Sequence, residues 1–318
     1  MKIQLNFLKA LAIFLLIGCG SAFGQAQARR QIDPAVAKLG KGFVSNTAKA
    51  NGTTLHYVRG GTGPAVILLH GFPQDWYEFH KIMLRLAKQF TVIAVDLRGI
   101  GGSAATPKGY EAANLAEDIH QLIRQLKLEK VYVAGHDIGG MVTYAFARLY
   151  PQTTRGVMIL EVPLPGLAPW DEVKAFWHIN FHQTPELPEA LLAGQQKTYF
   201  TFFFTGGTLN KKAITDADVT HYVNSYSTPA QLRAGLELYR AFPANEAFNA
   251  NQSSEIGIPL TLVGGDHSFG KMLPKLVEDL RRHGCKNVAL EIMQDSSHYV
   301  ADEQPEIVAA LIERYASL

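Results

Sequence analysis

The sequence predicts an α/β fold in which a mostly parallel, doubly wound sheet carries an inserted helical lid. Short apolar runs, each ending at a polar or glycine-rich turn, indicate strands that are buried on both faces. These runs are residues 65–69, 91–95, 131–134, 157–160 and 260–263. Segments with apolar residues at helical spacing accompany them, at 115–126 and 308–315. This alternation is typical of a parallel sheet covered by helices on both faces.

Residues 164–250 interrupt the alternation. They are rich in aromatic residues and have a helix-like pattern, and strands resume after them. Ligands of open α/β sheets bind at the edge formed by the carboxyl ends of the strands. We therefore expect a helical cap at 164–250 over that edge, inserted into a core made of 25–163 and 251–318. Within the core, residues 25–51 look like a polar lead-in and 53–59 alternate as a strand.

Composition excludes several classes of protein. The chain has 318 residues, of which 47% are apolar and 18% charged, so it can bury a large core and is not a disordered protein. Lys and Arg number 30, Asp and Glu number 28, and no run of basic residues is longer than two. Because nucleic-acid-binding surfaces are strongly basic, we expect no nucleic-acid partner.

The N-terminus has the pattern of a targeting signal. Lys2 and Lys9 precede the apolar run 11–17, and small residues follow as far as Gly24. This pattern predicts a secretory signal peptide at 1–24, and hence an exported protein, periplasmic or secreted. The apolar run is too short for a stable membrane span, so we expect none in the mature chain. The alternative is a lipoprotein anchored through Cys19, which lies in a short segment resembling a lipoprotein processing site.

The strongest chemical signal is a strand that runs into a tight glycine-rich turn and then a helix. Residues 131–134 lead into 135–140 (GHDIGG), and a helix-like stretch follows at 141–149. This is the form of a nucleophile elbow, in which small residues flank one exposed side chain. That side chain is Asp137, where other such elbows carry Ser or Cys.

Two further segments supply partners for Asp137. His298 follows a strand-like run at 288–293, which is where a general base belongs. The turn after 65–69 can offer the backbone N–H of Phe72 as half of an oxyanion hole. The N–H of Ile138, at a predicted helix N-terminus, would supply the other half.

In combination these motifs resemble the α/β-hydrolase family, specifically its epoxide hydrolase and dehalogenase branch. The matching segments are 70–78 (HGFPQDWYE), 96–103 (DLRGIGGS), the Asp137 elbow, and His298 ahead of 303–306 (EQPE). The resemblance covers roughly residues 43–318. It implies the α/β-hydrolase fold, the mostly parallel doubly wound sheet with an inserted helical lid, and it allows a homodimer.

The carboxylate nucleophile restricts the substrate. Attack on an ester carbonyl would give an anhydride, whereas attack on a strained or activated saturated carbon gives an ordinary alkyl ester. Asp137 therefore favours epoxides or haloalkanes over esters and peptides. Water activated by His298 would then hydrolyse the alkyl ester on Asp137.

Two carboxylates compete to orient His298. Glu161 follows the strand 157–160, and Asp266 follows the strand 260–263. In the family either strand supplies the acid. The 24-residue interval between Asp137 and Glu161 resembles the subgroup that uses the earlier position, so we favour Glu161 and keep Asp266 as the alternative.

The leaving group separates the two chemistries. An opened epoxide leaves an alkoxide that needs a hydrogen-bond donor, and by resemblance His178 and Tyr239 of the lid are those donors. A halide needs N–H donors, which the side chains of Ile138 and Phe72 lack. Haloacetate dehalogenases use arginines in the elbow helix, where this chain has Ile138 and Met141. The sequence thus favours an epoxide hydrolase over a haloalkane or haloacetate dehalogenase, or over a non-catalytic secreted binding protein.

We expect neither a cofactor nor a metal. The glycines of 96–103 do not form G-x-G-x-x-G, and His178 with His182 lacks the Glu and third ligand of an H-E-x-x-H site. The aromatic-rich lid suggests a small apolar epoxide as the substrate.

Overall fold

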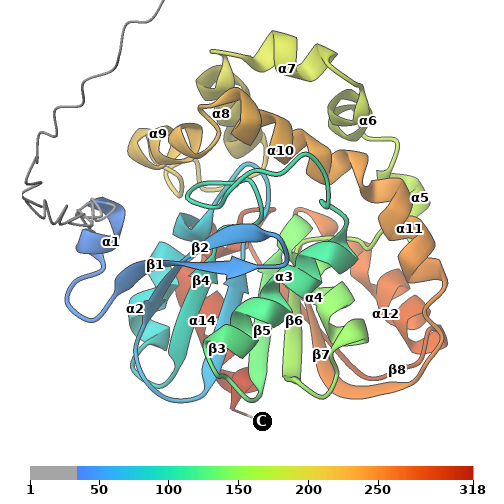
Figure 1. Cartoon of the computed structure of the whole chain (residues 1–318). Helices are drawn as coiled ribbons and strands as arrows, with labels where there is room; N and C mark the ends of the chain where they lie inside the picture. Colours follow the sequence, from blue (N-terminus) through green and yellow to red (C-terminus); the bar gives the residue numbers. More distant parts are fainter. Residues whose placement is uncertain (1–33, 318) are drawn as a thin grey trace, which may run out of the picture. The chain divides into compact units, whose positions relative to one another are not determined.

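A single eight-stranded sheet forms the centre of the protein. The computed structural model describes residues 34–317, so the predicted signal peptide and Cys19 lie outside the described residues. The strand order is β1-β2-β4-β3-β5-β6-β7-β8 (Figure 1). The strands are β1 (Val44–Ala50), β2 (Thr53–Gly60), β3 (Ala65–Leu69), β4 (Thr91–Val95), β5 (Val131–His136), β6 (Thr154–Leu160), β7 (Ile256–Gly265) and β8 (Cys285–Met293).

The sheet is antiparallel only at one side. β2 pairs antiparallel with β1 and with β4, and every pairing from β4 through β8 is parallel. β3 and β4 are buried along their whole length, as continuous apolar runs predict. The parallel strands end at one common edge of the sheet. The predicted α/β-hydrolase fold, with its mostly parallel sheet, is confirmed.

The first strand corrects the expectation of a polar lead-in over 25–51. Residues 44–50 form β1, which pairs with β2 along its length, from Val44 opposite Arg59 to Ala50 opposite Thr53. Most of its side chains are exposed or half-buried, because β1 is an edge strand. Its sequence therefore lacks the apolar run that marks a buried strand.

Helices cover both faces of the sheet. Figure 1 shows α3 and α4 in front of it and α14 behind. α3 packs against α4, and α14 packs against α2. The core helices are α1 (Pro34–Lys38), α2 (His80–Leu86), α3 (Ala112–Gln125), α4 (Ile138–Leu149), α12 (Leu273–Arg282), α13 (Val300–Glu303) and α14 (Pro305–Ala316), with short 3₁₀ helices η1 (Trp76–Phe79) and η2 (Phe269–Lys271).

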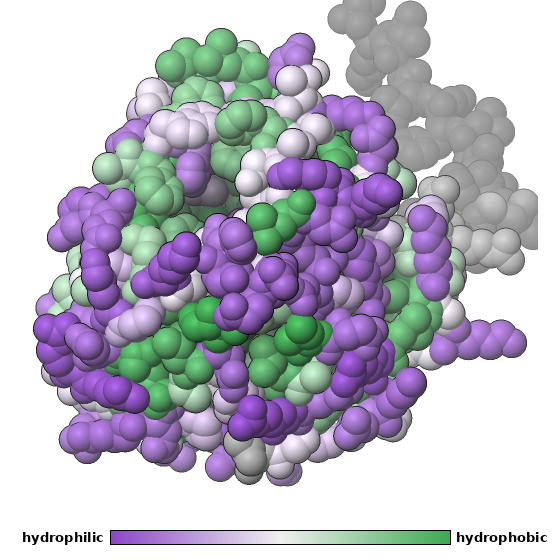
Figure 2. Space-filling view, turned by 180° about the vertical axis from the view of Figure 1, so that it is seen from behind, coloured by the Kyte–Doolittle hydropathy of each residue, from purple (hydrophilic) through white to green (hydrophobic). Residues whose placement is uncertain are grey.

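A run of helices connects β6 to β7. It comprises α5 (Trp170–Val173), α6 (Trp177–Gln183), α7 (Leu187–Leu192), α8 (Gln196–Gly206), α9 (Asp216–Ser225), α10 (Pro229–Arg240) and α11 (Phe242–Ala250). In Figure 1 α6 to α10 lie above one end of the sheet. Helices α6, α7 and α8 each carry an exposed apolar side chain, namely Trp177 (54% exposed), Leu191 (56%) and Phe202 (59%). In the view from behind, hydrophobic residues gather at the top of the molecule (Figure 2).

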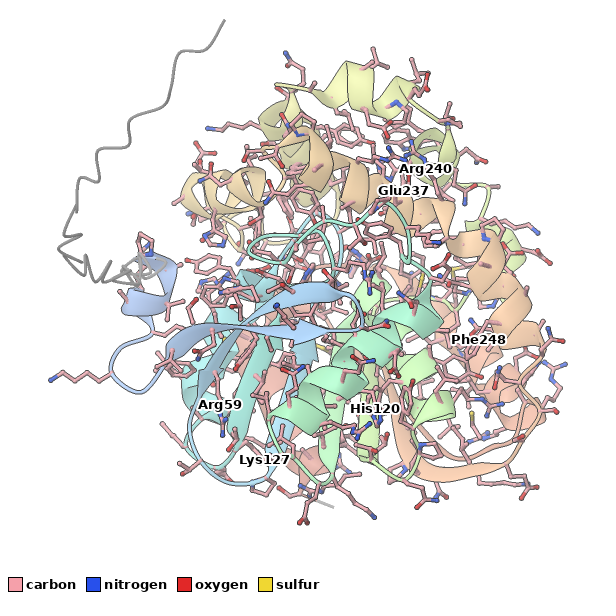
Figure 3. The ribbon with its side chains drawn as sticks, viewed as in Figure 1. Arg59, His120, Lys127, Glu237, Arg240 and Phe248 are labelled. Carbon is pink, nitrogen blue, oxygen red and sulfur yellow. The ribbon has the colours of Figure 1, made fainter. Side chains whose placement is uncertain are left out.

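The end of α10 is tied to α7 by a charged cluster. Arg240 donates to both carboxylate oxygens of Glu189, at 2.7 and 3.0 Å, and to Glu237 at 3.1 Å. Figure 3 labels Glu237 and Arg240 on α10. A bidentate Arg–carboxylate pair fixes geometry as well as adding energy. It thereby anchors the turn of α10 that carries Tyr239.

In the part of the chain from 34 to 317, no helix is both long and apolar enough to cross a membrane.

Candidate active site

The turn between β5 and α4 holds Asp137 in an unusual backbone conformation. Its φ is 50° and its ψ −123°, a region that costs an ordinary residue about 1–3 kcal/mol. Its N–H donates to the carbonyl of Leu160 at 3.0 Å, and its own carbonyl accepts from Gly140 at 2.8 Å. A Cβ on Gly139 would lie 2.1 Å from the carbonyl oxygen of Leu69. The glycine thus lets the first turn of α4 approach β3, and the strained turn presents the Asp137 side chain at the sheet edge.

The Asp137 carboxylate lies beside the turn after β3. The backbone N–H of Phe72 donates to Asp137 Oδ1 at 3.2 Å. A Cβ on Gly71 would lie 2.5 Å from the Asp137 Cβ, so only glycine allows this approach. Ile138 is the first residue of α4, and its side chain is buried. Its N–H belongs to the helix N-terminus that follows Asp137, where backbone donors favour negative charge.

His298 lies between Asp137 and Glu161. Its Nε2 is 3.8 Å from Asp137 Oδ2, and its Nδ1 is 3.6 Å from Glu161 Oε2. Both distances are longer than a hydrogen bond but within reach of an ion pair. The backbone N–H of His298 donates to the carbonyl of Gly207, just after α8, at 3.0 Å. The loop between β8 and α13 is therefore anchored to the helices above the sheet.

The structure separates the two competing carboxylates. Glu161 is fully buried and accepts hydrogen bonds from the backbone N–H groups of Gly265 and Phe269. Asp266 is partly exposed and accepts from the N–H of Ser296 at 3.2 Å. That hydrogen bond is the main cause that lowers the pKa of Asp266. The carboxylate that faces His298 is thus that of Glu161.

Two uncharged donors face the same cavity from the helices above. His178 of α6 and Tyr239 of α10 have ring centroids 6.2 Å apart. Burial lowers the pKa of His178 to about 4, although the negative charge of Asp137 acts in the opposite direction. The ring is therefore neutral at neutral pH. Burial also raises the pKa of Tyr239 well above 10, with the Asp137 charge adding to the effect. Each side chain therefore offers a hydrogen without carrying a charge.

The cavity between these groups is apolar and has a volume of about 330 Å³. Aromatic and aliphatic side chains from both the core and the helices α5, α6, α8 and α10 line most of it. Asp137, His178, Tyr239 and His298 all reach it. Among the described residues, the lining contains no Lys or Arg.

A buried ion pair, to which the sequence motifs assign no role, lies beneath the site. His136 Nδ1 lies 3.2 Å from Glu78 Oε1, and both side chains are 1% exposed. The signal was present in the sequence, because a histidine at the end of a buried strand needs a polar partner. Glu78 lies in the motif 70–78, but nothing in the pattern shows that it meets His136.

Because of this ion pair, we expect the free energy of unfolding of the protein to fall in alkaline solution. Burial is the largest single effect and disfavours the His136 cation, but the interaction with Glu78, the charge of Asp137 and the backbone carbonyl of His298 together outweigh it and raise the pKa of His136 from 6.5 to about 9. Because the folded pKa is the higher one, the stabilisation is complete below pH 6.5 and is lost as the pH rises through 9. The difference corresponds to roughly 3 kcal/mol in the free energy of unfolding.

Urea unfolding at pH 6.5 and pH 9.5 checks this expectation. The variant Glu78→Gln, whose side chain carries no charge, should lose most of the pH dependence. Equal pH dependence in the wild type and this variant would contradict the assignment.

Comparisons with known proteins agree with the fold. The family model described as alpha/beta hydrolase fold matches residues 64–305. A soluble epoxide hydrolase of Corynebacterium sp. (strain C12) is 33% identical over 82% of this chain and 93% of its own. A fluoroacetate dehalogenase of Burkholderia sp. is 30% identical over 63% of this chain and 70% of its own.

Solved structures give the same result. The structure of the epoxide hydrolase CorEH, without ligand, matches with a TM-score of 0.80 and 29% identity, over 86% of this chain and 99% of that one. The region matched by the family model, residues 64–305, includes the elbow, both candidate acids and His298. The chain belongs to the α/β-hydrolase family, in its epoxide hydrolase branch.

Proposed function

We propose that this protein is an epoxide hydrolase that opens an epoxide to a vicinal diol through a covalent ester on Asp137. The observation that carries the proposal is the pairing of a carboxylate with two uncharged donors across one apolar cavity. Asp137 is backed by His298 and Glu161, and His178 and Tyr239 face it from the other side. In this proposal 25–163 with 251–318 is the catalytic core, and 164–250 is the cap.

The first half-reaction forms the ester. An oxygen of Asp137 attacks one epoxide carbon, and a new C–O bond forms as the ring C–O bond breaks. The electron pair of the broken bond stays on the epoxide oxygen. That oxygen takes a proton from the Tyr239 hydroxyl and accepts a hydrogen bond from the His178 N–H. Because both groups are neutral beforehand, they stabilise charge only as it develops.

The second half-reaction frees the diol. Water gives a proton to His298 Nε2 and attacks the carbonyl carbon of the ester. The N–H groups of Phe72 and Ile138 stabilise the resulting oxyanion. The buried carboxylate of Glu161 stabilises the His298 cation and holds the ring in place. Collapse of the intermediate breaks the bond between the carbonyl carbon and the alkyl oxygen, and the proton on His298 passes to that oxygen. The second hydrogen of the water is left on the Asp137 carboxyl group, and its transfer to the Tyr239 phenolate restores both side chains for the next cycle.

The cavity argues against the dehalogenase alternative. A haloacetate carries a carboxylate, which needs a cationic partner in an apolar site. No Arg or Lys of the described chain lines the cavity. Ile138 and Met141, which occupy the matching positions of the elbow helix, are buried apolar side chains.

A turnover assay on the mature chain tests the function. The panel pairs aryl and alkyl epoxides with bromoalkanes of matched size and with fluoroacetate. We expect diol from the epoxides and little halide from the others. Release of halide at comparable kcat/KM, with no diol, would favour the dehalogenase. No turnover of any compound would favour the non-catalytic binding protein.

Removing the donors should slow the first half-reaction. Tyr239→Phe is expected to lower the rate of ester formation about 10²-fold, because the phenol supplies the proton to the leaving oxygen. His178→Gln, which keeps an N–H donor, should cost less. Stopped-flow measurement of ester formation separates this effect from hydrolysis. A Tyr239→Phe variant that forms the ester at the wild-type rate would remove Tyr239 from the mechanism.

We also propose that the chain is exported through the signal peptide at 1–24 and that the mature form is a homodimer. Both proposals rest on sequence, through the N-terminal pattern and the family resemblance. The mass of the mature N-terminus distinguishes a soluble exported chain from one acylated at Cys19. Light scattering measures the oligomeric state.

A further inference from the structure

The Glu78–His136 ion pair connects three segments of the candidate site. Glu78 Oε2 accepts from the N–H of Gly71 at 3.0 Å, next to Phe72. Glu78 Oε1 faces His136 Nδ1 at 3.2 Å. On the other side of the ring, His136 Nε2 lies 2.9 Å from the backbone carbonyl of His298. Since His136 directly precedes Asp137, the pair ties the Phe72 turn and the His298 loop to the nucleophile elbow.

The imidazolium form of His136 fits this position. One ring nitrogen faces a carboxylate and the other faces a carbonyl, so both nitrogens need a hydrogen. The Nδ1–H does not point closely enough at Oε1 to form a hydrogen bond, so charge attraction holds that contact. Near the His136 ring lie Asp137, the His298 ring at 4.7 Å and the Tyr299 ring at 6.1 Å. The charge of Glu78 also acts on the buried side chains of Asp302, Tyr222 and Tyr226.

Stability alone is a weak reason for such a pair. Removing two charges from water costs so much that an apolar pair of the same size is often equally stable. Geometric specificity is a better-supported use of buried ionic groups. Among the residues that line the cavity, the pair reaches His298 through its backbone and its ring, and Tyr299 through its ring. Asp137 is its neighbour along the chain, and Phe72 is the neighbour of Gly71, which the pair binds.

The two half-reactions depend on the pair to different degrees. Ester formation needs the Asp137 carboxylate and the donors His178 and Tyr239, which the cap carries. Ester hydrolysis needs the His298 ring and the Phe72 N–H, and the pair anchors both segments. We propose that Glu78 and His136 are positioning residues that align the general base and the oxyanion donor for hydrolysis of the ester on Asp137. This inference rests on the proposed epoxide hydrolase function.

Two variants separate the effect of the contact between His136 and the His298 backbone from the effect of the charges on Glu78 and His136. Glu78→Gln removes both charges, but its amide oxygen can still accept from Gly71. Its amide hydrogen can face His136 Nδ1, leaving a neutral ring that donates from Nε2 to the His298 carbonyl. Adding His136→Leu to Glu78→Gln cuts the link to His298 without leaving a lone buried charge, so the double variant is expected to fold. The single variant is its matched control.

Single-turnover mixing with an epoxide, followed by intact-mass spectrometry, measures ester formation and ester decay separately. The double variant should hydrolyse the ester about 10²-fold more slowly than Glu78→Gln, because small misplacements of reacting groups have effects of that size. Ester formation should differ between the two variants by less than about fivefold, since the same positioning is not required there. The double variant therefore accumulates alkylated enzyme.

The pH profile gives an independent readout. Above about pH 9 the wild-type His136 loses its charge. In this proposal the remaining hydrogen stays at Nδ1, because the negative charge of Glu78 faces that nitrogen. The bare Nε2 then faces the His298 carbonyl, so wild-type ester hydrolysis should fall. In Glu78→Gln the neutral ring already donates from Nε2, and the fall should be absent. Equal ester-decay rates in the single and double variants would overturn the inference. Absence of any ester in the wild type would instead overturn the proposed function.

Discussion

Replacing Asp137 with Ser is expected to lower epoxide turnover about 10⁴-fold or more, because the reaction loses its nucleophile. A serine hydroxyl is a poor nucleophile toward an epoxide carbon unless a base removes its proton. His298 is not placed to do this, because its Nε2 lies 3.8 Å from Oδ2 of Asp137 and is not hydrogen-bonded to it. The elbow itself should survive, because its conformation depends on Gly139 and Gly140 and on backbone hydrogen bonds. Initial-rate measurement of diol formation checks the loss.

The folded state provides the control for this variant. Circular dichroism and thermal unfolding should match the wild type, or show slight stabilisation, since a partly buried charge has been removed. A folded Asp137→Ser protein with more than a tenth of wild-type turnover would place the nucleophile elsewhere.

Replacing His298 with Gln is expected to stop the reaction after ester formation. Ester formation needs no general base, so one equivalent of epoxide should be consumed and retained. Hydrolysis should slow about 10³-fold or more, in the range seen when a general base is removed from a covalent mechanism. Intact-mass spectrometry should then find the protein heavier by the mass of the epoxide, and peptide mapping should place the increase at Asp137.

Variants of the acid that orients His298 provide a comparison for the His298→Gln result. Glu161→Gln can still accept the hydrogen bonds of the Gly265 and Phe269 N–H groups, but it carries no charge to stabilise the His298 cation. It should therefore slow hydrolysis of the ester without blocking it fully. Asp266→Asn should have little effect, because Asp266 binds the backbone of Ser296. A larger effect at Asp266 than at Glu161 would assign the orienting acid to the later strand.

The sequence predicts the parallel part of the sheet well because those strands are buried on both faces. The runs at 65–69 and 91–95 coincide with β3 and β4. β1 escapes prediction because an edge strand with one exposed face has no continuous apolar run. β7 and β8 begin earlier than their apolar segments, because residues 257–259 of β7 and 286–288 of β8 are exposed or half-buried and interrupt the apolar pattern.

The candidate site is predictable only where a residue is marked by its own neighbours in sequence. Asp137 is flanked by glycines and a buried strand, and His298 follows another strand, so both carry local signals. The choice between Glu161 and Asp266 depends on which carboxylate the fold turns toward His298. The contact between Glu78 and His136 joins residues 58 positions apart. Long-range contacts of this kind leave no local pattern.

In the proposed mechanism, the oxygen added to the substrate comes from Asp137 and not directly from water. A single turnover with excess enzyme in ¹⁸O-labelled water tests it, with mass spectrometry of the diol and of the peptide that contains Asp137. We predict an unlabelled diol from the first turnover and one ¹⁸O atom in the Asp137 carboxylate. A diol that carries ¹⁸O in that first turnover, with an unlabelled Asp137 peptide, would contradict the covalent mechanism.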